Sequence, residues 1–292
     1  MAQIDTIADR SSGTAVAGKA YFETSTNKFI VYNGSSWVEF DSDGTGSASS
    51  FSNGFTAALD GTNDYVSIGT AGDTFFDIGT NNFSCTFWIK LDSVTGSYTG
   101  VFGLAGNATG YQLYLTSGAI FQFWNAPSLT GNLSSALSTG QWYHVAVVKS
   151  SGLMTLYLNG TAGTSESVGS LSFTNDGFRV GDDPNGSFSP VNGLIDEFAF
   201  WKNYALTASE VSDIRGGVSA GTLGLPADIS AIGTNNSGGD GPDIWLRMGD
   251  GDDGAGNADG TVVGGFPQVY DMAGSKDGSL VNGPSFSSSV PS

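Results

Sequence analysis

The stretch GQWYHVAVVKSSGLMTLYLNG, residues 140–160, decides the fold of this chain. In its first half, Tyr143, Val145 and Val147 alternate with Trp142, His144, Ala146 and Val148, which is the period of two of a β-strand whose two faces are both largely covered. Residues 150–152 (SSG) supply a turn, and the period of two then resumes at Met154 until the Asn159-Gly160 reversal. The stretch is therefore a predicted β-hairpin.

Runs of the same kind flank this hairpin on both sides. They read LDGTNDYVSIG (residues 59–69), FSCTFWIKLD (83–92) and GLIDEFAFW (193–201), separated by turns rich in Gly, Asn, Asp and Ser. Many short strands joined by such turns predict an all-β protein, a two-sheet antiparallel sandwich. One helix is predicted, at residues 206–215, because Thr207 is a suitable N-cap, Glu210 follows three residues later, and Gly216-Gly217 ends the run.

The composition excludes several classes of partner. The chain has 28 acidic and 10 basic residues, a formal net charge of −18, so binding to nucleic acid or to anionic lipid is electrostatically unfavourable. Residues 1–10 show no apolar signal-peptide core, and no run of about 18 apolar residues occurs, so we expect cytoplasmic assembly and no membrane insertion. Cys85 is the only cysteine, which excludes an internal disulfide and favours a small core residue.

Composition shifts divide the chain into three predicted parts: an attachment meander with its linker (1–46), the sandwich (47–216) and a Gly- and Asp-rich extension (217–292). In the meander, the runs 19–24, 28–33 and 37–40 are too short to enclose a core of their own. We therefore expect another subunit to cover their aromatic side chains, in a homo-oligomer or a larger particle. These side chains are Tyr21, Phe22, Phe29, Tyr32, Trp37 and Phe40.

At residues 51–216 the chain resembles the concanavalin A-like jelly rolls and, among them, the laminin G-like domains. The opening LDGTNDYV, FSCTFWIK, the paired WYHVAVV and LYLNG strands and the closing GLIDEFAFWKNYALTASEV carry the resemblance in the family's order. It implies a jelly-roll sandwich, glycan binding as a family property, and often one Ca²⁺ ion. Two positions match such an ion, the turn with Asp60, Asn63 and Asp64, and the strand with Asp196. Alternatively, these carboxylates bond turn amides or make a buried polar link.

Residues 18–40 are similar to short modules in tail-fibre and other virion proteins of bacteriophages. WLRMGDGDDG (residues 245–254) and YDMAGSKDGSLVNG (270–283) resemble the opening of jelly-roll modules in marine phage proteins. Only the beginning of a second module is present, and it is too short to form a sandwich alone. We therefore expect it to pack on the first domain or on a neighbouring subunit.

The candidate sugar-binding residues are Trp124, with Asn125 and Gln122 beside it. A ring on an exposed sheet face stacks on a sugar, but the favoured interpretation places Trp124 in the core, with Phe121, Phe123 and Asn125 on one face of the strand and Gln122 and Trp124 on the other. The acidic loop at 250–259 is not an EF-hand, because Gly254, Ala255 and the missing Glu violate that pattern. A looser Ca²⁺ loop stays open there and at residues 182–186.

Catalysis has little support in the sequence. Glycosidases need two carboxylates on one face, whereas Asp196 and Glu197 are adjacent and are expected to point to opposite faces. His144 is the sole histidine, so a multi-histidine metal site is excluded, and no serine or cysteine nucleophile motif lies near it. The sequence predicts no enzyme.

The predicted function is a structural protein of a bacteriophage virion. It would be a capsid decoration protein or a short fibre or appendage, bound to other capsid or tail subunits, and its jelly roll would adhere to host-surface polysaccharide. The alternatives are a Ca²⁺-assisted lectin without a capsid role and, least favoured, a glycoside hydrolase.

Overall fold

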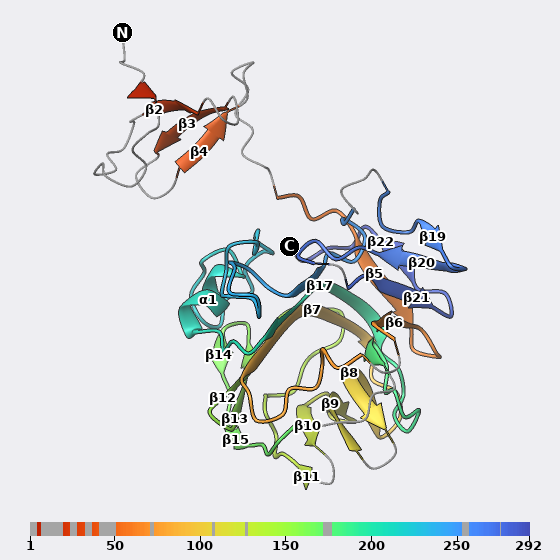
Figure 1. Cartoon of the computed structure of the whole chain (residues 1–292). Coiled ribbons are helices and arrows are strands. Elements are labelled where there is room, and N and C mark those ends of the chain that lie inside the picture. The colour runs from red at the N-terminus through yellow and green to blue at the C-terminus, as the bar shows by residue number, and fades with distance from the viewer. Residues whose placement is uncertain are drawn as a thin grey trace. The chain divides into compact units, whose positions relative to one another are not determined.

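Two compact units make up the chain in the computed structural model, Met1–Ser52 and Asn53–Ser292 (Figure 1). Residues 51–70, 73–106, 109–125, 128–171, 177–252, 257–274 and 276–292 are described, with the backbone of four strands before them. The predicted boundary between residues 46 and 47 thus lies six residues before the observed one. No boundary divides the second unit near residue 216.

The first unit is a four-stranded sheet in which β2, β3 and β4 form an antiparallel meander and β1 pairs with β2 in parallel. The three predicted runs are therefore confirmed as strands, and β1 is an addition. The bounds are β1 Asp5–Thr6, β2 Ala20–Glu23, β3 Lys28–Tyr32 and β4 Trp37–Phe40.

The second unit contains two antiparallel sheets, which confirms the predicted all-β jelly-roll sandwich. The sheet that we call the β8 sheet has the order β11-β10-β9-β8-β16-β6-β21-β20-β19. Its strands are β6 Tyr65–Ile68, β8 Tyr98–Gly106, β9 Thr109–Thr116, β10 Phe121–Asn125, β11 Ser128–Leu129, β16 Phe178–Val180, β19 Val262–Val263, β20 Phe266–Val269 and β21 Gly278–Val281.

The other sheet, the β7 sheet, has the order β14-β13-β12-β7-β17-β5-β22, with β15 beside β13 and β18 beside β17. The predicted hairpin of residues 140–160 is its β12–β13 pair. Its strands are β5 Thr56–Asp60, β7 Phe83–Ser93, β12 Trp142–Ser150, β13 Leu153–Leu158, β14 Thr161–Ala162, β15 Glu166–Ser167, β17 Asn192–Lys202, β18 Ile244–Leu246 and β22 Ser285–Ser287.

One continuous core fills the space between the two sheets. The period of two sends Phe83, Cys85 and Phe87 of β7 inward, all at most 1 % exposed, so the prediction of Cys85 as a core residue is confirmed. Aromatic rings dominate this core, and Phe83 stacks on Phe200 of β17 at a centroid distance of 5.4 Å. Offset ring pairs of this kind add to the hydrophobic stabilisation from burial.

The outer face of the β7 sheet is also buried. Trp88, Trp142 and Leu194 form a second apolar cluster there, and His144 beside them is fully buried. The cover is the chain between β17 and β18, which includes α1 (Ala208–Asp213) and lies on the side of β12, β7 and β17 away from β8–β10 (Figure 1). The two-sided burial of β12 expected from its sequence is therefore confirmed.

The helix α1 begins as its sequence predicts. The Thr207 hydroxyl accepts a hydrogen bond from the Glu210 backbone N–H, and the Glu210 carboxylate accepts one from the Thr207 N–H, which completes a capping box. Directly after the helix, the buried guanidinium of Arg215 donates to the carbonyl oxygens of Val211, Val218 and Thr222. None of the helices among the described residues is long and apolar enough to cross a membrane.

The C-terminal segment, residues 217–292, packs on the sandwich of its own chain. The sequence had left two possibilities, packing on the first domain or on a neighbouring subunit. The segment is more regular than the predicted irregular extension, because β21 pairs with β6 and β22 pairs with β5, so that it extends both sheets at once. Sheet edges expose unpaired backbone groups, and these additions cover the edges that β5 and β6 would present.

Leu280→Ala tests whether the C-terminal strands belong to the cooperative unit. Leu280 is 3 % exposed and lies in the common core, so we expect the free energy of unfolding to fall by about 2–5 kcal/mol. Denaturant titration of the full chain measures this. Val262→Ala, at a position 64 % exposed, is the control and should change stability by less than about 0.5 kcal/mol. Equal stabilities of the two variants would contradict the prediction.

Candidate functional site

A β-bulge in β17 places two carboxylates on the same face of the β7 sheet. Ile195 and Phe198 both lie in the core although they are three residues apart, and the register with β7 shifts between Asp196 and Ala199. The extra residue is taken up at Glu197, whose φ is +48°. Both Asp196 and Glu197 therefore leave the core side together. The sequence-based expectation that they point to opposite faces is wrong, because strict alternation fails at a bulge.

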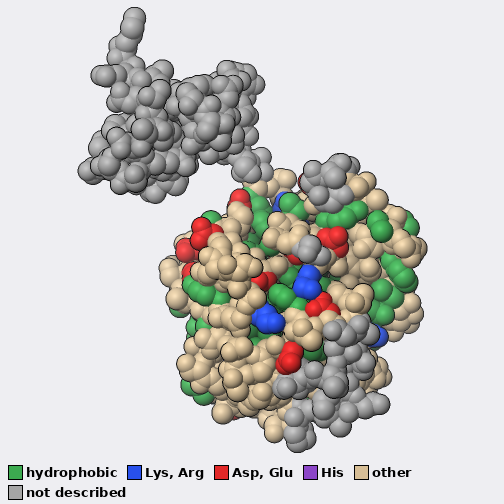
Figure 2. All heavy atoms as spheres, in the orientation of Figure 1, with side chains coloured by type: hydrophobic (Ala, Val, Ile, Leu, Met, Phe, Trp, Pro, Cys, Tyr) green, Lys and Arg blue, Asp and Glu red, His purple; other side chains and the backbone are tan. Residues whose placement is uncertain are grey.

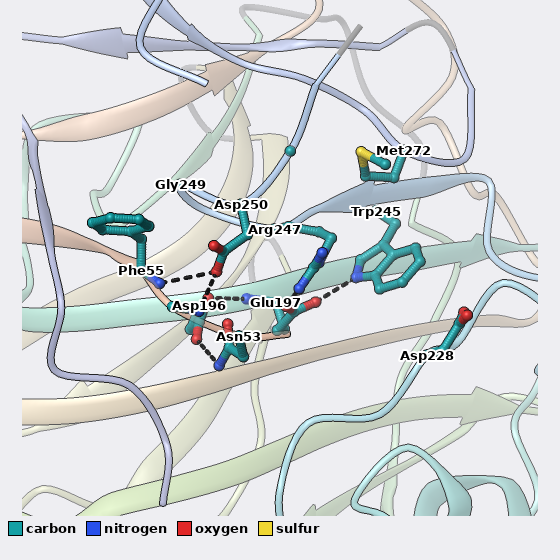
Figure 3. A network of polar contacts seen from close by, with 12 residues as sticks. Asn53, Phe55, Asp196, Glu197, Asp228, Trp245, Arg247, Gly249, Asp250 and Met272 are labelled. Carbon is teal, nitrogen blue, oxygen red and sulfur yellow. Dashed lines mark hydrogen bonds and ion pairs between the residues drawn. The ribbon is translucent and has the colours of Figure 1, made fainter. Parts of the chain in front are cut away.

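Hydrogen bonds from three segments hold this pair (Figure 3). The Asp196 carboxylate accepts from Asn53 Nδ2 at 2.8 Å and from the Glu197 backbone N–H at 2.9 Å. The Glu197 carboxylate accepts from Trp245 Nε1 at 2.6 Å and from Arg247 Nε at 3.1 Å. We call Asn53, Asp196, Glu197, Trp245 and Arg247 the acid latch.

Asp250 extends the latch to the backbone that leads into β5. Its carboxylate accepts from the N–H groups of Gly54 and Phe55 at 2.7 and 2.9 Å (Figure 3). The latch and Asp250 together join three distant segments, the start of the second unit, β17 and the chain after β18.

Burial changes the acidity of both latch carboxyl groups. It raises the pKa of Asp196 well above its usual range, and the neighbouring charge of Glu197 adds to the rise. Burial also raises the pKa of Glu197 to about 7, against the lowering effects of the Arg247 charge and of the hydrogen bond from Trp245. Near pH 7 the Glu197 carboxyl group therefore changes between its protonated and its ionised form.

The latch is closed to a polymeric substrate. Asp196 and Glu197 are 0 % and 5 % exposed, beneath Asn53, Trp245 and Arg247. A glycosidase needs its two carboxyl groups on either side of a bond in an accessible cleft. The geometry therefore favours a structural role for the pair. For Asp196, a buried polar link was the sequence-based alternative to calcium binding.

The turn after β5 holds the other residues predicted to bind calcium. Asp60 Oδ1 accepts from the backbone N–H groups of Thr62 and Asn63 at 2.7 and 3.4 Å, and Asp64 Oδ2 accepts from the Asp60 N–H at 3.1 Å. Burial and the nearby charge of Asp60 raise the pKa of Asp64. Asp60 and Asp64 line a pocket of about 360 Å³ with Asp92, Asn192 and Asn282.

The two predicted calcium positions, the turn at Asp60 and the strand at Asp196, lie apart in the structure. Asn192 pairs with Asp60, and Asp196 lies four residues further along β17, about 13 Å away at 3.3 Å per residue. Among the described residues, no three His, Cys, Asp or Glu side chains are grouped to hold a metal ion. Ca²⁺ takes six to eight oxygen ligands, so neither position fits the ion with its side chains alone. Calcium binding stays a prediction.

Trp124 and Asn125 lie on opposite faces of β10 and do not make one site. Asn125 lines a pocket of about 320 Å³ between β10 and residues 167–170. Trp124 is only partly buried and is not a member of the core, in contrast to the favoured interpretation of the sequence. It lies opposite Gln112 of β9 on the outer face of the β8 sheet.

The outer face around Trp124 combines aromatic rings with amides. We call it the Trp124 face, and its register places five side chains on it, Tyr98, Gln112, Tyr114, Gln122 and Trp124. Tyr98 is 41 % exposed, and Gln122 and Trp124 are partly buried, whereas Tyr114 and Gln112 are only 1 % and 4 % exposed. The Tyr114 hydroxyl donates to Gln122 Oε1 at 2.7 Å. The buried Oε1 of Gln112 accepts no hydrogen bond from any described residue.

The six rings predicted for particle attachment lie in the first unit, and their side chains fall outside the described residues. The backbone register aligns Phe22, Phe29 and Phe40 in one cross-strand row and pairs Tyr32 with Trp37. Tyr21 precedes Phe22 and pairs with Ile30, so the six positions fall on three cross-strand rows of the backbone.

Glu197→Gln tests the buried acid pair. Because the folded-state pKa of about 7 lies above the usual 4.5, the stability that Glu197 contributes is complete below pH 4.5 and is lost as the pH rises through 7. The stability of the native chain relative to the variant should therefore fall by on the order of 3 kcal/mol between pH 4.5 and 8.

Urea titrations of both proteins across this pH range measure the difference. Burial and the nearby charge of Arg215 lower the pKa of His144 to about 3, so His144 acts in the opposite sense, and comparison of two proteins that share it removes its effect. A stability difference that stays constant with pH would contradict the raised pKa of Glu197.

Comparisons with known proteins agree with this architecture. A Bacteroides ovatus protein for which carbohydrate binding is proposed is 17 % identical, with a TM-score of 0.57 over 93 % of this chain and 70 % of its own. Domain 4 of AbnA, a GH43 extracellular arabinanase from Geobacillus stearothermophilus, is 22 % identical over 55 % of this chain and 75 % of its own, with a TM-score of 0.44. At 17 % identity, the likeness to the Bacteroides ovatus protein shows the fold alone.

No curated protein matches the chain. The sequence profile described as the Concanavalin A-like lectin/glucanases superfamily matches residues 60–212, more than half of the 292 residues. This match spans the strands from the end of β5 to α1, which include both central strands of the β7 sheet. The chain belongs to the concanavalin A-like lectin/glucanase superfamily.

Proposed function

We propose that this chain is a surface subunit of a bacteriophage virion whose sandwich binds polysaccharide on the host. The Trp124 face carries the proposal for glycan binding. A partly exposed indole stacks on the C–H face of a sugar ring, and amide groups beside it bond the sugar hydroxyls. Gln122 supports this role, because it is only partly buried on the same strand face as Trp124 and its amide can bond a sugar hydroxyl group.

The virion role is supported by the first unit. Residues 18–40 resemble short modules of phage fibre and virion proteins, and they supply three strands of the four-stranded sheet that precedes the sandwich in the sequence. In the proposed arrangement this sheet attaches to other capsid or tail subunits, in a homo-oligomer, and the sandwich faces outward as a capsid decoration or a short appendage. Acidic side chains are scattered over the visible face of the second unit (Figure 2).

Two alternative functions make different demands on the molecule. A Ca²⁺-assisted lectin without a capsid role requires loop carboxylates that converge on an ion, and a glycoside hydrolase requires an accessible acid pair. The hydrogen-bonded turn at Asp60 and the closed latch at Asp196 favour neither. We therefore propose that the chain is not an enzyme.

Trp124→Ala tests the proposed binding face. We expect at least tenfold weaker binding to polysaccharide, about 1.4 kcal/mol, because the stacking surface is lost. A glycan array of host-type polysaccharides, followed by titration of each positive glycan, measures this with the full chain.

Leu153→Ala is the matched control for Trp124→Ala. Leu153 is 49 % exposed on β13 of the other sheet, so its loss should leave binding unchanged. The same array with a chelator should also be unchanged, and a loss of signal would instead support the Ca²⁺-assisted lectin. An array that stays silent under both conditions would overturn glycan binding.

Deletion of residues 1–46 tests the virion role. We expect the shortened protein to fold, because the second unit contains the whole sandwich, and to be missing from purified particles, because it lacks the attachment sheet. Electron microscopy and an adsorption assay of particles that lack the chain should show lost surface density and slower adsorption. Unchanged particle composition and unchanged adsorption would refute a role in the virion.

A further inference from the structure

A third, separate pocket lies at the edge of the sandwich, where the loop 132–136 faces β13 and β14. Its volume is about 560 Å³, within the range of small-molecule sites. We call it the edge pocket. It shares no residue with the acid latch, the turn at Asp60 or the Trp124 face.

The edge pocket has an apolar floor and a polar, uncharged rim. Leu133 and Leu156 in the floor are fully buried, and the half-buried Leu158 and Tyr143 lie beside them. None of the lining residues carries a charge, although 38 of the 292 residues in the chain are acidic or basic by sequence. The rim consists of amide and hydroxyl groups, those of Asn132, Ser134, Ser135, Asn159, Thr161 and Thr164.

Internal hydrogen bonds fix the two rim amides in one orientation. Asn132 Oδ1 accepts from Gln122 Nε2 at 2.8 Å, and Asn159 Oδ1 accepts from the His144 backbone N–H at 2.9 Å. Each oxygen is therefore engaged, and each amide NH₂ group donates to no other described residue. Such donors, held in place before a ligand arrives, lose little freedom on binding.

The backbone sets the width of the pocket. The Gly163 N–H donates to the Leu156 carbonyl at 2.8 Å, and a Cβ atom at Gly163 would lie only 2.1 Å from the Leu133 carbonyl oxygen. Only glycine allows the chain after β14 to come this close to the loop. On the other side, the Tyr143 hydroxyl accepts from the Ser138 N–H at 3.0 Å, which holds the ring at the end of the loop.

We propose that the edge pocket binds one uncharged sugar residue. A pyranose ring offers an apolar C–H face to the leucine floor and the tyrosine ring, and its hydroxyl groups meet the fixed amides and the rim hydroxyls. An acidic sugar is selected against, because the lining has no cation to pair its carboxylate and the chain carries a net charge of −18. The pocket has no lining residue in common with the Trp124 face, although Asn132 of its rim is bonded to Gln122 of that face, and it goes beyond the function proposed above.

The test uses saturation-transfer NMR on the full chain with monosaccharides as probes. Glucose, galactose, mannose and N-acetylglucosamine form the neutral set, and glucuronic, galacturonic and N-acetylneuraminic acids form the acidic set. We expect at least one neutral sugar to bind with a millimolar Kd, and the acidic sugars to bind at least tenfold more weakly. Absence of binding by every neutral sugar, or equal binding by both sets, would overturn the proposal.

Ala136→Trp and Thr164→Trp fill the pocket from two exposed positions on opposite sides, so the fold should be kept. Both should weaken neutral-sugar binding at least tenfold. Ala231→Trp makes the same change at an exposed residue outside the pocket and should bind as the native chain does. Binding that persists in both filled variants would place the sugar elsewhere and refute the assignment.

Trp124→Ala separates this inference from the proposed function. Trp124→Ala should keep the component of monosaccharide binding that Ala136→Trp removes, because Trp124 does not line the edge pocket. A positive glycan array that depends on Trp124, without any monosaccharide signal that depends on Ala136, would refute the edge pocket alone. A silent array, with monosaccharide binding lost in Ala136→Trp, would refute the polysaccharide function and keep the pocket.

Discussion

The constraint on which this structure depends is the burial of the β7–β17 strand pair on both faces. On the inner side, Phe83 and Phe200 pack in the core between the sheets. On the outer side, the chain from α1 to β18 covers Trp88 and Trp142. Long strands that are apolar on both faces need two covers, and the chain supplies the second after the last strand of its matched family segment.

Because of this cover, both proposed ligand sites lie away from the outer face of the β7 sheet. The cover buries the outer face of the β7 sheet at Trp88, Trp142 and Leu194, whereas on the outer face of the β8 sheet Tyr98 is 41 % exposed and Trp124 is partly exposed. The open edge between β10 and β13 then provides pockets, because neither sheet closes over it completely. The positions of the Trp124 face and of the edge pocket therefore depend on which sheet the chain itself covers.

The same cover explains why so many charged groups are buried. Arg215 is buried, and its guanidinium group donates hydrogen bonds to backbone carbonyl oxygens. Among the described residues it has no acidic partner. The acid latch pairs Glu197 with Arg247 across 50 residues of chain. Buried polar groups of this kind contribute little net stability, but loss of one partner is costly, so they fix one register of the cover on the sheet.

The sequence by itself determined the strands, the sandwich and the capped helix, because each depends on local periodicity or on residues three apart, as Thr207 and Glu210 show. It also identified Cys85 as a core residue. Only the tertiary structure decided that Asp196 and Glu197 share a face, since a bulge breaks the alternation that sequence reasoning assumes, and that Trp245 and Arg247 meet them from 48 and 50 positions away. The exposure of Trp124 and the edge pocket were likewise beyond the sequence, because both depend on which distant segments cover a strand.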